Sequence, residues 1–359
     1  MKINELEIKN FRNLTQIDLK PDPGMNVIYG ENAQGKTNLI EAIWMLSGMK
    51  SFRGAKDTEL KAFDSDFARI SASFENADRT NDVEMTVTDR RRAVLNGVAL
   101  LSPSALLGKF GAVVFSPAFL SIVQNGPSER RKFIDAAVCR ISPAYATVLA
   151  EYARLLRQRN SLLKDVYHES SLLDMLDILD EKLARTGEVL IRRRKAFLEQ
   201  LTPFVRDIYN GLSSGRETLQ MRYVTQYDEE KQPLQAYLRE NRKNDLINKT
   251  TCVGPHRDDM EILIDGARAR LYGSQGQQRS CALALKLGES SVIKSVTGEE
   301  PVTLLDDVMS ELDTNRQDYV LNHIKNRQVF ITCCEPSSVI RLNGGKRINI
   351  AGGRIVSCT

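Results

Sequence analysis

The sequence has few of the residues that build zinc sites or disulfide frameworks. Its six cysteines form no C-x-x-C pair and no zinc spacing, and His168, His256 and His323 are scattered along the chain. Regularly spaced cysteines would predict disulfides, and paired Cys and His would predict a metal site. Neither pattern is present, so we expect reduced thiols in the core of a cytoplasmic protein.

Long apolar runs and a strong net charge are also missing. No stretch approaches the length of about 18 apolar residues that a membrane-spanning helix needs, and the segment Met1–Leu6 lacks the apolar stretch of a secretion signal. The 50 basic and 46 acidic residues give a net charge of only +4. We therefore expect no membrane association, and any surface for a polyanion must come from local clusters of charge.

One segment that is present carries specific chemistry. Residues 30–37 match the phosphate-binding pattern G-x-x-x-x-G-K-[ST] with Gly30, Glu31, Asn32, Ala33, Gln34, Gly35, Lys36 and Thr37. In such a loop the glycines turn backbone N–H groups toward phosphates, the lysine reaches the β and γ oxygens, and the hydroxyl binds Mg²⁺. A strand-like run at 26–29 and a helix-like run at 38–46 flank the loop. This context predicts a nucleotide site, whereas a chance glycine-rich turn is the alternative.

A second segment places two carboxylates after an apolar run. Asp306 and Asp307 directly follow Val302–Leu305, and the carboxyl end of a parallel strand is where such a sheet usually holds Mg²⁺ and water. We expect Asp306 to bind the metal with Thr37, and Asp307 to orient the attacking water or accept its proton. Alone, the pair is equally consistent with a capped turn, but the upstream phosphate loop favours the metal site.

A third segment is Ser274-Gln275-Gly276-Gln277. A serine N-cap, a glycine that permits close approach and free N–H groups at a helix start would form an anion site. Alone this pattern is weak, because Ser-x-Gly occurs in many turns. Together with Lys36 and Asp307, we take Ser274, Gly276 and Gln277 as the candidate catalytic residues.

Periodicity divides the chain into a β-rich part and a helical part. Residues 1–125 alternate as half-buried strands, for example at 68–74 and 83–87, with a hairpin turn at Asn96-Gly97. Residues 126–244 carry helix starts at Gly126-Pro127 and Ser142-Pro143.

In that helical part, two long three-four repeats follow, up to about 163 and over 172–210, and they predict an antiparallel helix hairpin. After residue 245, strand-like alternation returns at 260–264 and 267–271, and 281–287 is apolar on nearly all sides. The pattern predicts an α/β nucleotide-binding lobe split by a helical insertion.

The three chemical segments together resemble the phosphate loop, signature segment and paired acids of ATP-binding-cassette (ABC) ATPases. Within that class, the sequence is most similar to the RecF family of recombination mediators, which is related to the SMC-type ATPases. Further segments carry this likeness: Phe11-Arg12-Asn13, Phe115-Ser116-Pro117, Gly126–Arg131, Gly254-Pro255-His256-Arg257-Asp258-Asp259, Gly273–Arg279 and Ser310-Glu311-Leu312-Asp313. The likeness extends from the first strand to the last acidic loop.

This resemblance implies an ABC-ATPase-like lobe with mixed β-sheets, residues 1–125 plus 245–359, split by a short coiled-coil-like helical lobe, 126–244. It implies ATP and Mg²⁺ as cofactors and a homodimer in which Ser274 of one chain touches the γ-phosphate held by the other. It further implies binding to single-stranded and duplex DNA at gaps or junctions, and recombinase loading with RecR and RecO. Arg12 and Asn13 are implied to reach the nucleotide, although a strand-end turn explains them equally well.

Two departures from the wider cassette class predict slow hydrolysis. The residue that directs water is usually Glu, whereas this chain has Asp307, and the histidine expected after the next strand is replaced by Thr332, Cys333 and Cys334. Charge stabilisation and water positioning carry most of phosphoryl-transfer catalysis. We therefore expect a weak DNA-dependent ATPase in which ATP acts mainly as a dimerisation switch. Gln124 is a weak candidate for the glutamine that links nucleotide to the helical lobe in that class.

Four local basic clusters are candidates for contacting DNA. They are Arg90–Arg92, Arg130–Lys132, Arg192–Lys195, and Arg53 with Lys56. A single basic run is more often a solvated face, but with the family likeness we expect at least one of them to contact phosphates. Aromatic residues do not interleave with these runs, so we expect backbone-dominated binding without sequence preference.

The alternative function is an ABC-type ATPase switch coupled to a protein or membrane partner with no DNA role. Transport subunits of that kind lack a two-helix insertion of this shape and normally carry the missing histidine. A structural ATPase with long coils is disfavoured, because roughly 35 helical residues extend only about 50 Å.

Overall fold

The computed structural model describes residues 1–77, 79–165, 173–334 and 345–359, so His168 and Leu172 lie outside the described residues. The chain forms two compact units, residues 1–119 with 283–359 and residues 120–282. The insertion expected at 126–244 lies within the second unit, which begins at Leu120 and extends to Ala282. The unit extends this far because the strands between residues 219 and 268 pair with one another inside it.

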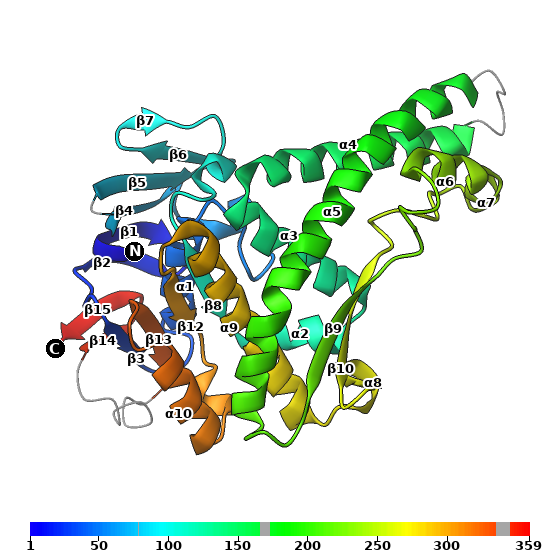
Figure 1. Ribbon diagram of the computed structural model, residues 1–359. Helices are drawn as coiled ribbons and strands as arrows, with labels where there is room; N and C mark the ends of the chain where they lie inside the picture. The colour runs from blue at the N-terminus through cyan, green and yellow to red at the C-terminus, as the bar shows by residue number, and fades with distance from the viewer. Residues whose placement is uncertain (78, 166–172, 335–344) are drawn as a thin grey trace. The chain divides into compact units, whose positions relative to one another are not determined.

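The first unit is built on a sheet, and Figure 1 shows its strands. They are β1 (Lys2–Phe11), β2 (Leu14–Leu19), β3 (Met25–Tyr29), β4 (Ala68–Asn76), β5 (Arg79–Val87), β6 (Arg91–Leu95), β7 (Val98–Ala99), β8 (Ala112–Phe115), β12 (Val302–Leu305), β13 (Val329–Cys333), β14 (Lys346–Ala351) and β15 (Arg354–Cys358). Within the described residues these form a 12-stranded sheet in the order β7-β6-β5-β4-β1-β2-β15-β14-β3-β13-β12-β8.

The sheet is antiparallel at one end and parallel at the other. Strands β1, β2, β4, β5 and β6 pair antiparallel, and Ile70 faces Met85 across β4 and β5. Strands β14, β3, β13, β12 and β8 run parallel, and every residue of β8, β12 and β13 is buried. Parallel strands end at the same edge of a sheet. The segments that follow β3 and β12 therefore come together there.

Helices complete the first unit. They are α1 (Lys36–Met45), α10 (Thr314–His323) and the short turns η1 (Asp57–Leu60), η2 (Pro103–Leu106), η3 (Pro117–Leu120) and η5 (Met309–Glu311). Leu39, Ile40 and Ile43 of α1 are fully buried in the same apolar core as the strands. Helix α9 (Gln275–Thr297) begins in the second unit and ends in the first. Its residues 281–290 are all buried, as the apolar run predicts.

The second unit is mainly helical. It contains α2 (Ser121–Gln124), α3 (Pro127–Ile141), α4 (Pro143–Asp165), α5 (Leu173–Leu212), α6 (Leu234–Glu240), α7 (Arg242–Asn248), α8 (Ala269–Tyr272), and the strands β9 (Leu219–Val224), β10 (Asp259–Ile264) and β11 (Ala267–Arg268). Leu163 packs on Leu176, and Arg159 pairs with Asp180. As residue numbers rise on α4 they fall on α5, so the predicted antiparallel hairpin is confirmed (Figure 1).

One predicted strand is wrong. The alternation over 267–271 predicts a continuous strand, but β11 ends at Arg268, and Ala269–Tyr272 form the short helix α8. Ala269 is buried, whereas Leu271 is 60% exposed. The Gln278 side chain donates hydrogen bonds to the carbonyls of Ala269 and Arg270 at 3.0 and 3.3 Å. These tertiary bonds stabilise the helical turn over the strand that periodicity favours.

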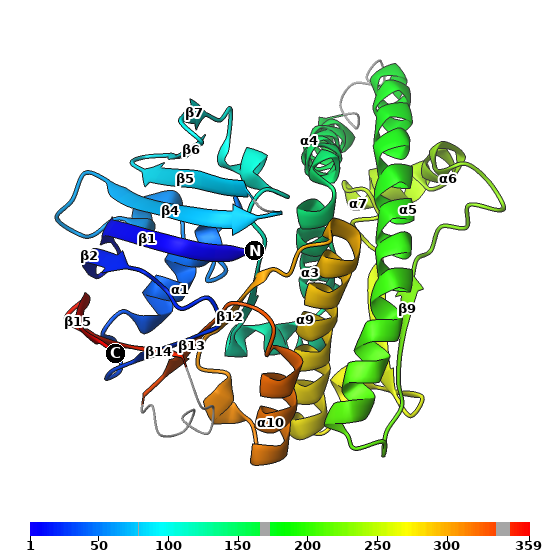
Figure 2. The same ribbon diagram turned by 60° about the vertical axis from the view of Figure 1, so that its left-hand side comes forward.

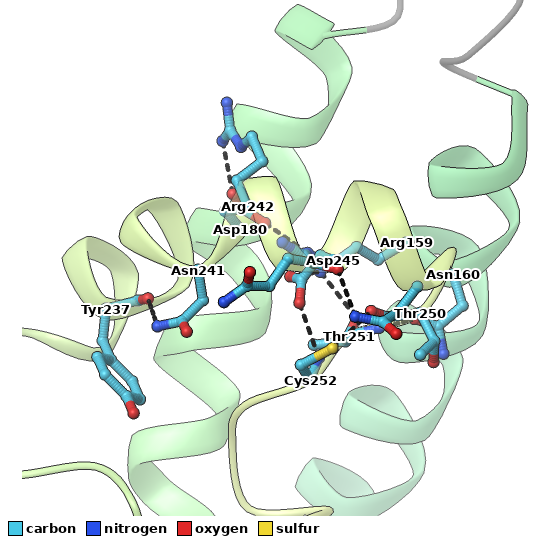
Figure 3. A network of polar contacts seen from close by, with 12 residues as sticks. Arg159, Asn160, Asp180, Tyr237, Asn241, Arg242, Asp245, Thr250, Thr251 and Cys252 are labelled. Carbon is cyan, nitrogen blue, oxygen red and sulfur yellow. Dashed lines mark hydrogen bonds and ion pairs between the residues drawn. The ribbon is translucent and has the colours of Figure 1, made fainter.

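A buried ion network holds the second unit together (Figure 3). The Arg159 guanidinium lies between the carboxylates of Asp180 and Asp245, each 2.6 Å away, and all three side chains are fully buried. Arg159 also donates to Thr251 at 2.8 Å. Because buried charges are tolerated only when paired and hydrogen-bonded, this arginine fixes α7 and the turn after it on the α4–α5 hairpin.

The segment Gly254–Asp259, which carries part of the family likeness, lies next to this network. The His256 Nδ1 lies 2.7 Å from the Tyr152 hydroxyl, and the His256 Nε2 lies 3.0 Å from the carbonyl oxygen of Thr251. That carbonyl can only accept, so Nε2 carries the proton and Nδ1 accepts from the Tyr152 hydroxyl. Burial lowers the pKa of His256 to about 4, so the neutral ring acts as a structural link at neutral pH.

Among the residues that the structure describes, no helix has both the length and the apolar character needed to cross a bilayer.

Candidate nucleotide-binding site

The phosphate loop joins β3 to α1, as the sequence predicts. Its backbone takes positive φ angles at Gly30 (147°), Ala33 (63°) and Gly35 (113°). A Cβ at position 30 would lie 2.3 Å from the carbonyl oxygen of Ile350, so only glycine fits there. Helix α1 begins at Lys36, and its first N–H groups therefore face the loop, where they favour an anion.

Lys36 lies across the loop. Its Nζ donates to the carbonyls of Gly30 and Glu31 at 2.7 and 2.8 Å, and the residue is only 5% exposed. Glu31 and Asn32 are exposed at the loop's outer surface. The buried stem fixes the ammonium where the motif requires a positive charge for the β and γ oxygens.

Thr37 and Asp306 come together although they are far apart in the sequence. The Thr37 hydroxyl donates to Asp306 Oδ1 at 2.8 Å. Burial raises the pKa of Asp306, the nearby charge of Asp307 raises it further, and the Thr37 hydrogen bond opposes the shift. A buried carboxylate beside a second carboxylate is stabilised by a cation. Hydroxyl and carboxylate oxygens are the ligands that Mg²⁺ prefers, so the donor set fits this ion.

The backbone of Asp307 has an unusual conformation and is hydrogen-bonded to Thr332. Its φ of 52° lies in the left-handed region, and its N–H donates to the Thr332 hydroxyl at 2.9 Å. That hydroxyl donates in turn to Asp306 Oδ1 at 3.1 Å. Unusual backbone angles in non-glycine residues cluster at functional sites, as the φ of Asp307 does here. Because Thr332 contacts Asp306 and Asp307, its hydroxyl orients both acids.

The Thr332 contact was not foreseen from the sequence, which identified this position only as one that lacks the histidine of the cassette class. A hydroxyl residue at the end of the apolar run 329–331 was the available signal. In the region where the cassette class carries its histidine, this chain therefore has a threonine that supports the two carboxylates.

Arg12 and Asn13 contact the protein around the loop. Arg12 donates twice to the Glu41 carboxylate, at 2.5 and 3.0 Å, and Glu41 is fully buried. Asn13 donates to the carbonyl of Ala33 at 3.0 Å and accepts from Asn38 at 2.7 Å. Both residues therefore support the loop, and their contact with the nucleotide stays a prediction. The sequence patterns did not identify Glu41, although a single acidic residue within an apolar helix was an available signal.

The signature-like segment forms the expected N-cap of α9. The Gln277 N–H donates to Ser274 Oγ at 3.2 Å, and the Ser274 N–H donates to Gln277 Oε1 at 2.7 Å. This reciprocal pair is a capping box. Gln277 Nε2 also donates to Glu217 at 2.9 Å, whereas Ser274 is exposed and Gly276 is half-buried. The helix start is therefore fixed with the Ser274 hydroxyl at the surface.

Gln124, the weak candidate for the linking glutamine, lies in the same unit as this segment. Its Nε2 donates to Gln278 Oε1 at 2.9 Å, next to the capped helix start. Its relation to the nucleotide stays a prediction.

Known proteins are similar to this chain in sequence and in fold. Residues 2–107 match the family described as RecF/RecN/SMC N terminal domain. The DNA replication and repair protein RecF of Agathobacter rectalis is 41% identical over 338 residues, 93% of this chain and 92% of that protein. A solved structure of the recombination mediator protein RecF with ATP, in the RecFOR pathway, is 39% identical with a TM-score of 0.91. It covers 100% of this chain and 97% of that one.

More distant structures share the fold alone. The Smc head domain of Pyrococcus furiosus, solved with an extended coiled coil and bound to the C-terminal domain of ScpA, is 17% identical with a TM-score of 0.57. The match covers 100% of this chain and 96% of that one. The sheet, the phosphate loop and the paired acids thus define an ABC-type nucleotide-binding head of the SMC kind. At 38–41% identity over most of its length to proteins named RecF, the chain belongs to the RecF family.

Proposed function

We propose that the chain is an ATP-dependent DNA-binding protein of recombination and repair that dimerises when it binds ATP. The observation that carries the proposal is the convergence of Lys36, Thr37, Asp306 and Asp307 at one edge of the parallel sheet. On the basis of family membership, the proposal also includes binding to DNA at gaps or junctions, the partners RecO and RecR, and a cytoplasmic location.

Each residue of the site has a role in this proposal. The loop N–H groups and Lys36 bind the phosphates, and Thr37 and Asp306 hold Mg²⁺, which supplies charge neutralisation when bound. Asp307 orients the attacking water, and its backbone is fixed by Thr332. The exposed Ser274 hydroxyl of a second copy contacts the γ-phosphate. Because Asp307 is one methylene shorter than the usual Glu, hydrolysis is slow and serves mainly to release the dimer.

The mass of the protein in solution tests the proposal. Light scattering at micromolar protein is expected to show a monomer without nucleotide and a dimer with ATP and Mg²⁺. ATP should also increase binding to gapped duplex in a gel shift, because two copies present their DNA surfaces together. A monomer that binds ATP at this concentration would contradict the dimer. An ATP-dependent dimer with no affinity for DNA would favour the alternative switch function.

In two of the four basic runs, arginines contact the protein itself. Arg130 is buried and donates twice to Asp259, at 2.6 and 2.9 Å, and Arg131 donates to the Asp258 carbonyl at 2.7 Å. Arg194 is buried against Asp135 at 2.8 Å. The buried arginines Arg130 and Arg194 are therefore not available for phosphates, whereas Arg131 is half-buried and donates to one backbone carbonyl. Of the run at 192–195, Arg192 and Arg193 stay exposed, one turn after Glu188.

Two other runs, distant in sequence, join into one basic surface on the first unit. Arg91 donates to the Met49 carbonyl at 2.7 Å and pairs with Asp57 at 2.8 Å. Arg91 thereby ties the 49–57 segment to the start of β6. Lys50, Lys56 and Arg90 flank these anchor points and are exposed. We take these three residues as the surface that contacts DNA phosphates.

Neutralising this surface is expected to weaken DNA binding and its salt dependence. Each lost phosphate contact lowers the slope of log affinity against log salt by about 0.9. The triple variant Lys50→Gln/Lys56→Gln/Arg90→Gln should therefore lower the slope by roughly 2 to 3. Fluorescence anisotropy with gapped duplex over a range of salt measures this, and ATP affinity should stay unchanged.

The matched control removes the same charge from the outer face of the sheet. Lys9 and Arg69 lie opposite each other on β1 and β4, Lys20 pairs with Glu5 of β1, and all three side chains are exposed. Glu5, Glu7, Asp82 and Glu84 line the same face, which disfavours phosphates. Equal losses in the control and the test variant would show that net charge, and not this surface, determines binding.

A further inference from the structure

The last two strands of the chain lie beside the phosphate loop. Strand β14 pairs in parallel with β3, the strand that leads into the loop, with Asn349 opposite Tyr29. Strand β15 returns antiparallel to β14 and meets β2, and Figure 2 shows this hairpin at the C-terminus. Residues 352 and 353 form the turn between the strands. The turn therefore lies at the edge of the sheet where the loop begins.

The turn is hydrogen-bonded to one loop residue, Gln34. The Gly352 N–H donates to Gln34 Oε1 at 2.7 Å, and the Gly353 N–H donates to the Gln34 carbonyl at 3.2 Å. Gln34 thus accepts one bond through its side chain and one through its backbone. Gln34 lies between Ala33 and Gly35, which both have positive φ angles. The β14–β15 turn therefore fixes the loop at this point.

Gly353 also packs against the other support of the loop. A Cβ at position 353 would lie 1.9 Å from the carbonyl oxygen of Asn13, and φ at Gly353 is +71°. The Gly353 carbonyl accepts from the Thr15 N–H at 3.2 Å. Because the Asn13 side chain donates to Ala33, the turn and Asn13 contact each other and hold the loop from adjacent positions.

We propose that the β14–β15 turn is a positioning element of the ATP site, which holds Gln34 so that the loop N–H groups converge on the phosphates. The proposal rests on the nucleotide binding proposed above and adds a coupling to it. A ligand that binds the ordered loop better than the disordered loop must stabilise the contacts that order it. ATP binding and the ordering of the C-terminal hairpin therefore stabilise each other.

The first test is Gly353→Ala, which places a methyl group against Asn13. A displaced turn leaves Gln34 without its two donors, so ATP affinity is expected to fall at least about tenfold. Isothermal titration of the full chain with ATP and Mg²⁺ measures the affinity, and circular dichroism confirms the fold. The control is Gly97→Ala, at a hairpin turn with φ of +78° where an added Cβ meets nothing within 4 Å. Its ATP affinity should match the wild type.

A second test leaves the hairpin sequence intact. Gln34→Met keeps the length of the side chain but removes the acceptor for Gly352, and ATP affinity should fall roughly three- to tenfold. Hydrogen exchange gives a readout that does not depend on turnover. The amides of residues 350–354 should exchange more slowly with ATP in the wild type, and this protection should be lost in Gln34→Met.

The outcomes separate the two proposals. Wild-type protein that binds no ATP would refute the nucleotide site, and the coupling with it. Wild-type binding that both Gly353→Ala and Gln34→Met retain, with no ATP-dependent protection of residues 350–354, would overturn the positioning role alone.

Discussion

Replacing Lys36 with alanine is expected to weaken ATP binding at least about a hundredfold. The Lys36 Nζ is held at the loop by the Gly30 and Glu31 carbonyls, and hydrogen bonds to charged groups contribute about 1.5–3 kcal/mol each. Loss of two such bonds to phosphate oxygens corresponds to 3 kcal/mol or more, which is over a hundredfold in affinity. Titration calorimetry with ATP and Mg²⁺ measures the change.

The fold should survive this change, because Lys36 makes its contacts to loop carbonyls at the surface of the core. Lys9→Ala is the control, since Lys9 is exposed on the outer face of β1. ATP-dependent dimerisation should disappear in Lys36→Ala and persist in Lys9→Ala. An affinity for ATP within threefold of the wild type in Lys36→Ala would show that this loop does not bind the phosphates.

The second large effect is expected from Asp307→Asn. The amide cannot accept a proton from water, so turnover should fall about a hundredfold to a thousandfold. Asparagine tolerates the left-handed backbone that Asp307 adopts, and the bond from its N–H to Thr332 stays. ATP binding should therefore persist, and the ATP-bound dimer should accumulate. Phosphate release under single-turnover conditions and light scattering measure the two effects.

The matched control is Asp318→Asn, an exposed carboxylate on α10, which should change neither turnover nor mass. Normal turnover in Asp307→Asn would remove Asp307 from its role with the attacking water. Slow turnover without accumulation of the dimer would place the release step elsewhere than hydrolysis.

Much of the site could be predicted because its chemistry is local in sequence. The loop at 30–37, the acids after β12 and the capped helix start at Ser274 each follow from a short pattern. What the patterns missed depends on long-range contacts. Thr332 reaches Asp306 and Asp307 through the pairing of β12 with β13, and Gly352 reaches Gln34 through the pairing of β14 with β3.

Charge patterns were the least informative part of the sequence. Arg130 and Arg194 stand in basic runs, yet both are buried and paired with Asp259 and Asp135. Arg90 and Lys56 are in separate runs, yet the ion pair between Arg91 and Asp57 joins the segments that carry them. The strand predicted at 267–271 was wrong for a related reason, because Gln278 stabilises a helical turn there.

The sequence by itself identified the phosphate-loop pattern and the paired acids of the proposed nucleotide site, the alternation of buried strands and the two long helices of the insertion. These follow from short patterns, because turns, caps and amphipathic faces depend on neighbouring residues. Only the tertiary structure decided which charges are buried, which hydroxyl supports the acids and which turn holds the phosphate loop. Parallel strands bring together segments separated by hundreds of residues, and a local pattern carries no record of that register.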